Sequence, residues 1–381
     1  MKAIINGKIV VPSGILENKV LVTRDGKIVD IADVVPDGFD VIDAKDMVVA
    51  PGFVDVHIHG SIGADVMDGS VDGVREISSG IAQYGTTSFL PTTMTMDQRD
   101  VYKSLEVIRK LQGEALAGAE VLGAHLEGPF INVKYKGAQN EAFVTSPDYE
   151  WIRDFSDVIK LITYAPEMDP DFEFTKRVKA ETDAVLSIGH SDASYEQATQ
   201  AVDHGCSHMT HLFNAMTGLH HRDPGIVGTA LIHDVYVELI ADKVHVNEHL
   251  FQFLLNNKGR DLIVLITDSM RAGCMKDGVY DLGGQEVYVK DGVARLIDGT
   301  LAGSVLTLNQ AVRNFYECTD ATLSEAIGMA SLNPATSIKV SDRKGSLEIG
   351  KDADVILLDA EFNCHLTLVK GEVVYKRKDE S

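Results

Sequence analysis

The sequence predicts an α/β protein, a (β/α)8 TIM-like barrel with a small β-sandwich domain formed from both chain termini. Two observations predict this fold. The middle of the chain alternates eight short apolar runs with candidate helices, whereas both ends carry β-branched runs separated by tight turns. The 381 residues suffice for a barrel of about 250 residues and a small second domain.

The N-terminal segment reads as short strands over residues 3–5, 8–11, 18–22 and 27–31. Asn6-Gly7 and Asp25-Gly26 separate such runs, and both turn residues of these pairs tolerate the positive φ of a hairpin. Similar runs at 354–358, 366–369 and 373–375 lie near the other end. Two marginal sheets are more stable joined than apart, so we expect residues 1–51 and 346–381 to form one discontinuous β domain.

Residues 52–345 are expected to form the barrel. Eight apolar runs, each ending in polar residues or glycine, cover residues 53–59, 86–92, 121–128, 158–167, 184–191, 208–214, 235–242 and 262–269. Candidate helices between them include 98–116, 194–204 and 247–257. Such alternation indicates parallel strands with crossover helices. A doubly wound open sheet is the alternative, but no glycine-rich phosphate loop follows the first run. A β-hairpin insertion is expected near 278–303.

Composition excludes several partners. The chain has 57 acidic and 35 basic residues and a net charge of −22, which disfavours nucleic-acid binding. We find neither an apolar run of about eighteen residues that would span a bilayer nor a signal-peptide pattern. The four cysteines lack paired spacing, so a disulfide framework is not indicated. We therefore expect a cytoplasmic protein without membrane or nucleic-acid partners.

Residues capable of metal binding or acid–base chemistry gather where the apolar runs end. His57 and His59 share one face of the first strand, where two imidazoles inside a barrel are hard to accommodate without a cation. Glu127, His190, His211 and Asp268 close the third, fifth, sixth and eighth runs. Each of these residues taken singly also has a structural interpretation. A lone histidine at a strand end is more often structural, Glu127 alone is compatible with a helix or turn partner, and Asp268 alone with a helix cap. Their shared position at C-terminal strand ends favours a metal-dependent hydrolase instead.

Five motifs contain these residues or follow them in the chain: Pro51-Gly52-Phe53-Val54-Asp55-Val56-His57, His125-Leu126-Glu127-Gly128-Pro129-Phe130, Gly189-His190-Ser191, Thr210-His211-Leu212-Phe213-Asn214-Ala215-Met216 and Leu301-Ala302-Gly303-Ser304. Together they resemble the N-acetylglucosamine-6-phosphate deacetylase family of the amidohydrolase superfamily. The likeness runs over essentially the whole chain. It implies metal-dependent deacetylation of N-acetyl-D-glucosamine 6-phosphate to D-glucosamine 6-phosphate and acetate, in amino-sugar catabolism and recycling. It also implies one or two divalent cations per subunit, zinc or iron, and a homodimer.

The resemblance also implies roles for single residues. Glu127, His190 and His211 would hold the principal metal, and His57 with His59 a second one, although some relatives lack that pair. Many relatives have a bridging lysine after the fourth strand; here none stands there, and Glu127 would bridge. Asp268 would act as acid and base. Substrate-contacting positions are Ala138, Gln139, Asn214, Ala215, Arg222, His245, Leu301, Ala302 and Gly303, and at 139 many relatives carry histidine.

Two other functions remain open from the sequence. One is a different small-amide hydrolase of the same superfamily, dihydroorotase-like or isoaspartyl-dipeptidase-like. The other is a metal-binding barrel without catalysis. The absence of a lysine after the fourth strand and the motif around Glu127 argue against the first. Metal analysis together with an amidase assay distinguishes the second from an enzyme, because bound metal without hydrolysis would favour a non-catalytic barrel.

Overall fold

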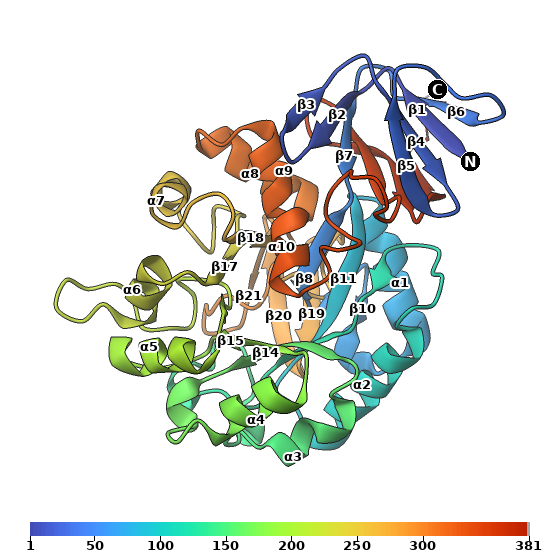
Figure 1. Ribbon diagram of the computed structural model, residues 1–381. Coiled ribbons are helices and arrows are strands. Elements are labelled where there is room, and N and C mark those ends of the chain that lie inside the picture. Colours follow the sequence, from blue (N-terminus) through green and yellow to red (C-terminus); the bar gives the residue numbers. More distant parts are fainter. Residues whose placement is uncertain (379–381) are drawn as a thin grey trace.

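The computed structural model describes residues 1–378 and shows a closed parallel barrel with a β domain at one end (Figure 1). The barrel strands are β8 (Phe53–Ile58), β11 (Thr86–Thr93), β13 (Ala124–Glu127), β14 (Ile159–Tyr164), β15 (Val185–Ile188), β16 (His208–Met209), β17 (Tyr236–Ile240) and β18 (Ile263–Ile266). Parallel pairing runs in this order, and a bridge between Ile58 and Ser269 closes the ring. The predicted fold class is confirmed, and each of the eight apolar runs contains one barrel strand.

Helices cover the outside of the barrel; α1 to α7 lie between barrel strands in the chain, and α8 to α10 follow the last one (Figure 1). They are α1 (Val71–Ala82), α2 (Gln98–Leu111), α3 (Tyr149–Ile152), α4 (Glu173–Glu181), α5 (Tyr195–His204), α6 (Gly225–Ile232), α7 (His249–Lys258), α8 (Leu308–Cys318), α9 (Leu323–Met329) and α10 (Leu332–Ser337). Short 3-10 helices are η1 (Val66–Asp68), η2 (Val133–Tyr135), η3 (Glu141–Phe143), η4 (Arg153–Phe155) and η5 (Pro166–Met168).

Local sequence signals explain where these helices start and stop. Ser194 caps α5 in a capping box with Gln197, as expected for a helix that begins there. α2 ends at Leu111, five residues before the predicted 116, because Gly113 adopts a φ of 78° that an α-helix does not accommodate. The residues of α2 that face the barrel, such as Val101, Leu105 and Ile108, are buried.

The β domain consists of two sheets. One has the order β5-β4-β1-β6, and the other the order β24-β23-β22-β7-β2-β3. Their bounds are β1 (Lys2–Ile5), β2 (Lys8–Val11), β3 (Gly14–Leu16), β4 (Val20–Arg24), β5 (Lys27–Ala32), β6 (Asp40–Asp43), β7 (Val48–Pro51), β22 (Val355–Leu358), β23 (Cys364–Val369) and β24 (Glu372–Lys376). N-terminal β7 pairs antiparallel with C-terminal β22, so both chain ends share one sheet and one apolar core. The residue limits that divide the two domains remain a prediction.

A three-stranded antiparallel sheet follows β18 in the chain. It contains β19 (Gly278–Leu282), β20 (Gln285–Lys290) and β21 (Val293–Arg295). Gln285 on β20 donates a hydrogen bond to the carbonyl of Ala138, which ties this sheet to the loop after β13. The remaining short strands are β9 (Gly60–Ser61), β10 (Ala64–Asp65) and β12 (Glu120–Val121). None of the helices within residues 1–378 has the length and apolar character needed to cross a bilayer.

A buried ion cluster joins the barrel to the β domain. The ammonium of Lys344 is fully buried and lies 2.6 Å from Glu120, 3.1 Å from Asp352 and 2.6 Å from Asp354. Arg343 also contacts Glu120 and Asp352, at 3.1 and 2.9 Å. Burial alone would raise the pKa of Glu120, but the charges of Lys344 and Arg343 lower it to about 2. Glu120 belongs to β12, which pairs with the barrel strand β11, whereas Asp352 and Asp354 lie just before β22 of the β domain. The cluster therefore fixes the position of the β domain against the barrel.

Replacing the central cation should destabilise the fold. Lys344→Met leaves three buried carboxylates without their shared partner, and we expect the free energy of unfolding to fall by about 3–5 kcal/mol. Urea unfolding at pH 7 measures this change. Lys19→Met is the matched control, because Lys19 pairs with the exposed Asp33, and such surface pairs contribute about 1 kcal/mol or less. Equal losses in both variants would contradict the structural role of the cluster.

The same cluster predicts acid sensitivity. In the folded protein the pKa of Glu120 is lowered from 4.5 to about 2, and that of Asp352 from 3.8 to about 2. A depressed carboxyl pKa stabilises the folded state above its unfolded value, and this contribution is lost as the pH falls through the folded value. Wild-type stability should therefore decline between pH 4.5 and 2, with a shallower decline in Lys344→Met. Urea unfolding across this pH range tests the difference.

Candidate active site

A cavity of about 320 Å³ opens at the C-terminal ends of the barrel strands. Most of the predicted site residues line it: His59, Glu127, Ala138, Gln139, His190, His211, Asn214, Ala215, His245, Asp268, Leu301 and Gly303. Leu282 and Thr300, in and beyond the three-stranded sheet, also line the cavity. The volume lies within the range of small-molecule sites.

Four imidazoles converge on the carboxylate of Glu127 at the floor of this cavity. The Oε1 atom of Glu127 lies 3.1 Å from His190 Nε2, 3.2 Å from His211 Nε2 and 3.3 Å from His57 Nε2. Its Oε2 atom lies 3.3 Å from His59 Nε2. These side chains come from β8 and the residue that follows it, from β13, and from the segments after β15 and β16, so barrel closure brings them together.

In three of these rings, the hydrogen bond at Nδ1 determines whether the Nε2 atom that faces Glu127 carries a proton or a lone pair. The Nδ1 atoms of His59, His190 and His211 face the backbone carbonyls of Thr92, Tyr135 and Asn214 at 3.2, 2.8 and 3.2 Å. A carbonyl can only accept, so each Nδ1 must carry a proton. In a neutral imidazole the Nε2 atom then holds a lone pair that points at Glu127.

Lone pairs this close together repel one another unless a positive charge lies between them. The Nε2 atoms of His190 and His211 lie 3.1 Å apart, and both face a buried carboxylate oxygen. Glu127 with His190 and His211, and Glu127 with His57 and His59, each form a group whose ligand atoms lie within 4.8 Å of one another. Imidazole and carboxylate donors suit zinc and ferrous iron. The donor set therefore fits one or two divalent cations.

Asp268 lies beside the same imidazoles. Its Oδ1 atom is 3.2 Å from His59 Nε2 and 3.5 Å from His57 Nε2. Burial would raise the pKa of Asp268, but the two imidazoles lower it to about 2. Burial likewise disfavours the charged form of His59, yet hydrogen bonds to Asp268 and Glu127 raise its pKa to about 9. No helix begins at Asp268, so this residue is not a helix cap.

The backbone bends sharply where it presents these side chains. His190, His211 and Asp268 have φ values of 49°, 29° and 48°, a region that costs a non-glycine residue of the order of 1 kcal/mol or more. Gly189 permits the turn before His190, because a Cβ there would lie 2.6 Å from Cβ of Thr210. Strained backbone of this kind concentrates at functional sites and points each side chain into the cavity.

Gln139 has two partners in the structure. Its amide nitrogen donates to Glu127 Oε2 at 2.7 Å, and its amide oxygen accepts from the backbone N–H of Thr95 at 2.7 Å. The side chain is buried and holds the carboxylate of Glu127 in place. This orienting contact is a different role from the substrate contact expected from the sequence, although Gln139 also lines the cavity.

Two predicted substrate contacts do not lie in the cavity wall. Arg222 is exposed on the loop before α6, where its guanidinium contacts His221 Nε2 at 2.6 Å. The loop directs the guanidinium toward solvent, which the sequence could not show. Ala302 is buried in the apolar cluster behind the wall, with Met94 and Met270. His245 does line the cavity, and Asp242 binds its Nδ1 at 2.6 Å.

Sequence reasoning missed the carboxylates that support the ligands from behind. Glu238 on β17 is fully buried and contacts His57; the charge of His57 lowers the pKa of Glu238 to about 2 against the effect of burial. Glu167 accepts from Ser191 Oγ at 2.6 Å and from the N–H of Asp192 at 2.6 Å, which holds the loop carrying His190. A glutamate within the apolar strand 236–240 was the available signal.

Fold and site together define a hydrolase of the amidohydrolase type. The model of the amidohydrolase family matches residues 48–374. The chain is 40% identical to the N-acetylglucosamine-6-phosphate deacetylase of Bacillus subtilis (strain 168), over 97% of this chain and 96% of that protein. It is 36% identical to the N-acetylgalactosamine-6-phosphate deacetylase of Escherichia coli O157:H7, over 96% and 97%.

A solved structure agrees with these matches. The crystal structure of N-acetylglucosamine-6-phosphate deacetylase from Pasteurella multocida superposes with a TM-score of 0.92 and 31% identity, covering 98% of this chain and 99% of that one. The chain therefore belongs to the amidohydrolase family, in the group of the N-acetylglucosamine-6-phosphate deacetylases.

Removing the charge of Glu127 tests the ligand assignment. Glu127→Gln keeps the side-chain shape but lacks the negative charge of the carboxylate on which four imidazoles converge, so we expect loss of the principal metal and of nearly all activity. Metal content by mass spectrometry and turnover provide the measurements. Glu196→Gln on the exposed face of α5 is the control, with both properties unchanged. Full metal content in Glu127→Gln would overturn the assignment.

Proposed function

We propose that this enzyme deacetylates N-acetyl-D-glucosamine 6-phosphate to D-glucosamine 6-phosphate and acetate, in amino-sugar catabolism and recycling. The convergence of four imidazoles, Glu127 and Asp268 at the cavity floor is the observation that supports an amide hydrolysis. The similarity to the Bacillus subtilis deacetylase supports the choice of substrate. We further propose a homodimer in the cytoplasm, as the resemblance to the deacetylase family suggests.

The cation would be held by Glu127, His190 and His211, and a second one by His57, His59 and Glu127. When bound, a divalent cation polarises the acetamide carbonyl and lowers the pKa of a water molecule toward about 7. The chain's own groups hold this region in place through the outward Nδ1 hydrogen bonds and through Gln139. Zinc and iron both suit these donors.

Asp268 is the group proposed to move protons. Its carboxylate lines the cavity within 3.2 Å of His59 Nε2, and it is ionised in the folded protein because its pKa is about 2. It would take the proton from the attacking water and return it to the sugar nitrogen, because an amide anion is too poor a leaving group to depart unprotonated. His245, Asn214 and the 301–303 segment would orient the sugar from the cavity wall.

Comparison of two sugar phosphates tests the function. Purified protein should release acetate from N-acetyl-D-glucosamine 6-phosphate, lose this activity on chelation and regain it with Zn²⁺ or Fe²⁺. The relative from Escherichia coli O157:H7 makes N-acetyl-D-galactosamine 6-phosphate the second candidate substrate. A larger kcat/KM with the galactose epimer would transfer the assignment to that sugar. Bound metal without acetate release from either sugar would favour a non-catalytic barrel.

Asp268→Asn separates proton transfer from metal binding. Asparagine keeps the shape but cannot accept the proton, so we expect unchanged metal content, KM within a few-fold and kcat lower by at least about 10²-fold. Single-turnover rates and metal analysis on one preparation provide both readouts. Loss of metal along with activity would make Asp268 an essential ligand, whereas retained turnover would remove it from the mechanism.

Arg222→Ala tests recognition of the phosphate. If the guanidinium binds the 6-phosphate, kcat/KM for the phosphorylated sugar should fall by an amount equivalent to roughly 2–4 kcal/mol. Turnover of unphosphorylated N-acetyl-D-glucosamine should barely change. Arg99→Ala serves as the control, because Arg99 is an exposed arginine that pairs with Asp97 at the start of α2. Equal losses with both sugars would assign Arg222 a structural role.

A further inference from the structure

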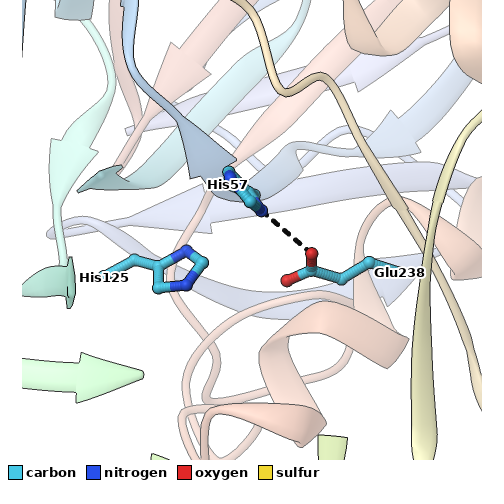
Figure 2. A group of neighbouring side chains, drawn as sticks. All are labelled: His57, His125 and Glu238. Atoms are coloured by element: carbon cyan, nitrogen blue, oxygen red, sulfur yellow. Dashed lines mark hydrogen bonds and ion pairs between the residues drawn. The ribbon is translucent and has the colours of Figure 1, made fainter. Parts of the chain in front are cut away.

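Glu238 is a charged residue at the centre of a buried parallel strand. It lies on β17 between the apolar residues Val237 and Leu239, and its side chain is fully buried in the barrel interior. Glutamate is rarely buried without a partner, because the transfer of a carboxylate from water is costly. Figure 2 shows its carboxylate pointing toward His57, with His125 facing the same space from β13.

One oxygen of Glu238 holds two of the proposed ligand residues. Its Oε2 atom lies 2.9 Å from Nδ1 of His57 and accepts a hydrogen bond from the backbone N–H of His211, also at 2.9 Å. The first contact fixes the ring plane of His57 and leaves its Nε2 directed at Glu127 Oε1, 3.3 Å away. The second fixes the main chain that carries His211. Ligands of both proposed cations therefore depend on a single carboxylate.

His57 differs in this respect from the other three imidazoles. Their Nδ1 atoms are bound by neutral backbone carbonyls, whereas that of His57 faces a carboxylate. A carboxylate behind a ligating imidazole both orients the ring and makes it a stronger donor. This arrangement would increase the affinity of the proposed second cation site, which His57 and His59 form with Glu127.

The same residues could be read as a third cation site, because ligand atoms of His57, His125 and Glu238 lie within 4.8 Å of one another. The hydrogen bonds argue against this reading. His125 uses Nδ1 toward the carbonyl of Val56 at 3.0 Å and Nε2 toward Thr163 Oγ1 at 2.7 Å. Nδ1 of His57 is occupied by Glu238. A cation bound through Nδ1 of His57 and one nitrogen of His125 would displace two of these bonds, so we infer that the group supports the site above it.

We propose that Glu238 is a positioning residue that sets the affinity of the second cation, the one between His57, His59 and Glu127, by orienting and polarising His57. The proposal rests on the two-cation assignment of the proposed function. It assigns no contact with substrate to Glu238.

Zinc titration of the metal-free protein tests the role of Glu238 without substrate. Glu238→Gln keeps the volume and an acceptor oxygen for the N–H of His211 but removes the charge behind His57. By calorimetry we expect the first Zn²⁺ equivalent to bind within a few-fold of wild type and the second to bind about 10–100-fold more weakly. Glu238→Met is the second variant in case Glu238→Gln does not fold; it also lacks the acceptor for the N–H of His211, so both equivalents should weaken, the second by a larger factor than the first.

Two controls separate positioning from general damage. Tyr164→Phe removes a buried hydroxyl that contacts Thr175 and Cys206 away from the cavity, and both Zn²⁺ equivalents should bind as in wild type. In a His57→Asn background the second equivalent is already lost, so adding Glu238→Gln should change the remaining equivalent by no more than a few-fold. This double-mutant cycle assigns the effect to His57.

Each outcome decides the inference. Selective weakening of the second equivalent that disappears in the His57→Asn background supports it. Equal weakening of both equivalents, no change in either, or uptake of only one equivalent by the wild type overturns it. Wild-type protein that binds two equivalents and responds to Glu238→Gln as expected, yet releases no acetate from either sugar phosphate, would overturn the proposed function and leave the role of Glu238 intact.

Discussion

The structure depends on one electrostatic constraint, the convergence of Glu127, Asp268 and four imidazoles in a space shielded from water. The imidazole Nε2 atoms lie 3.1–3.5 Å from oxygen atoms of these two carboxylates, and their lone pairs repel unless a positive charge lies between them. A proton on His59, whose pKa is raised, supplies part of this positive charge. Divalent cations would supply all of it. The barrel makes the arrangement durable, because the groups are carried by the ends of five different strands, with His57 and His59 both at the end of β8.

Other parts of the structure hold these ligand residues in place from several sides. Below it, a buried polar layer of the barrel interior contains His125, Thr163, Thr210 and Glu238, linked by hydrogen bonds to one another or to the ligands. Behind the rings, backbone carbonyls fix the protonated Nδ1 atoms. Above it, the three-stranded sheet narrows the cavity with Leu282. A ligand set held on all sides in this way is preorganised, so little reorganisation is required when a cation or substrate binds.

The sequence predicted the parts of this site that follow from periodicity. Alternation placed His57 and His59 on one face of β8, and the ends of parallel strands must meet at one end of a barrel. The alternation of apolar runs with candidate helices predicted the eight strands, and these two rules predicted where their polar ends would meet. The contacts of Gln139 and Glu238 could not be predicted, because their partners Glu127, Thr95, His57 and His211 lie on other strands and loops. The exposed position of Arg222 could not be predicted for a related reason: a loop sequence does not specify which way its side chains point.

The two ends of the proposed substrate face different kinds of structure. Apart from the imidazoles around Glu127, the basic side chains lining the cavity are Lys134 and His245. Asp192 pairs with Lys134 at 2.7 Å, and Asp242 holds His245 at 2.6 Å. A phosphate of the proposed substrate has to compete with Asp192 and Asp242 for these basic groups, or be bound by exposed groups outside the cavity wall such as Arg222. In this proposed binding mode, buried and rigid groups would bind the acetamide end, and more exposed groups would bind the phosphate end. A net charge of −22 does not oppose such a substrate, since only the local field where the phosphate binds needs to be positive.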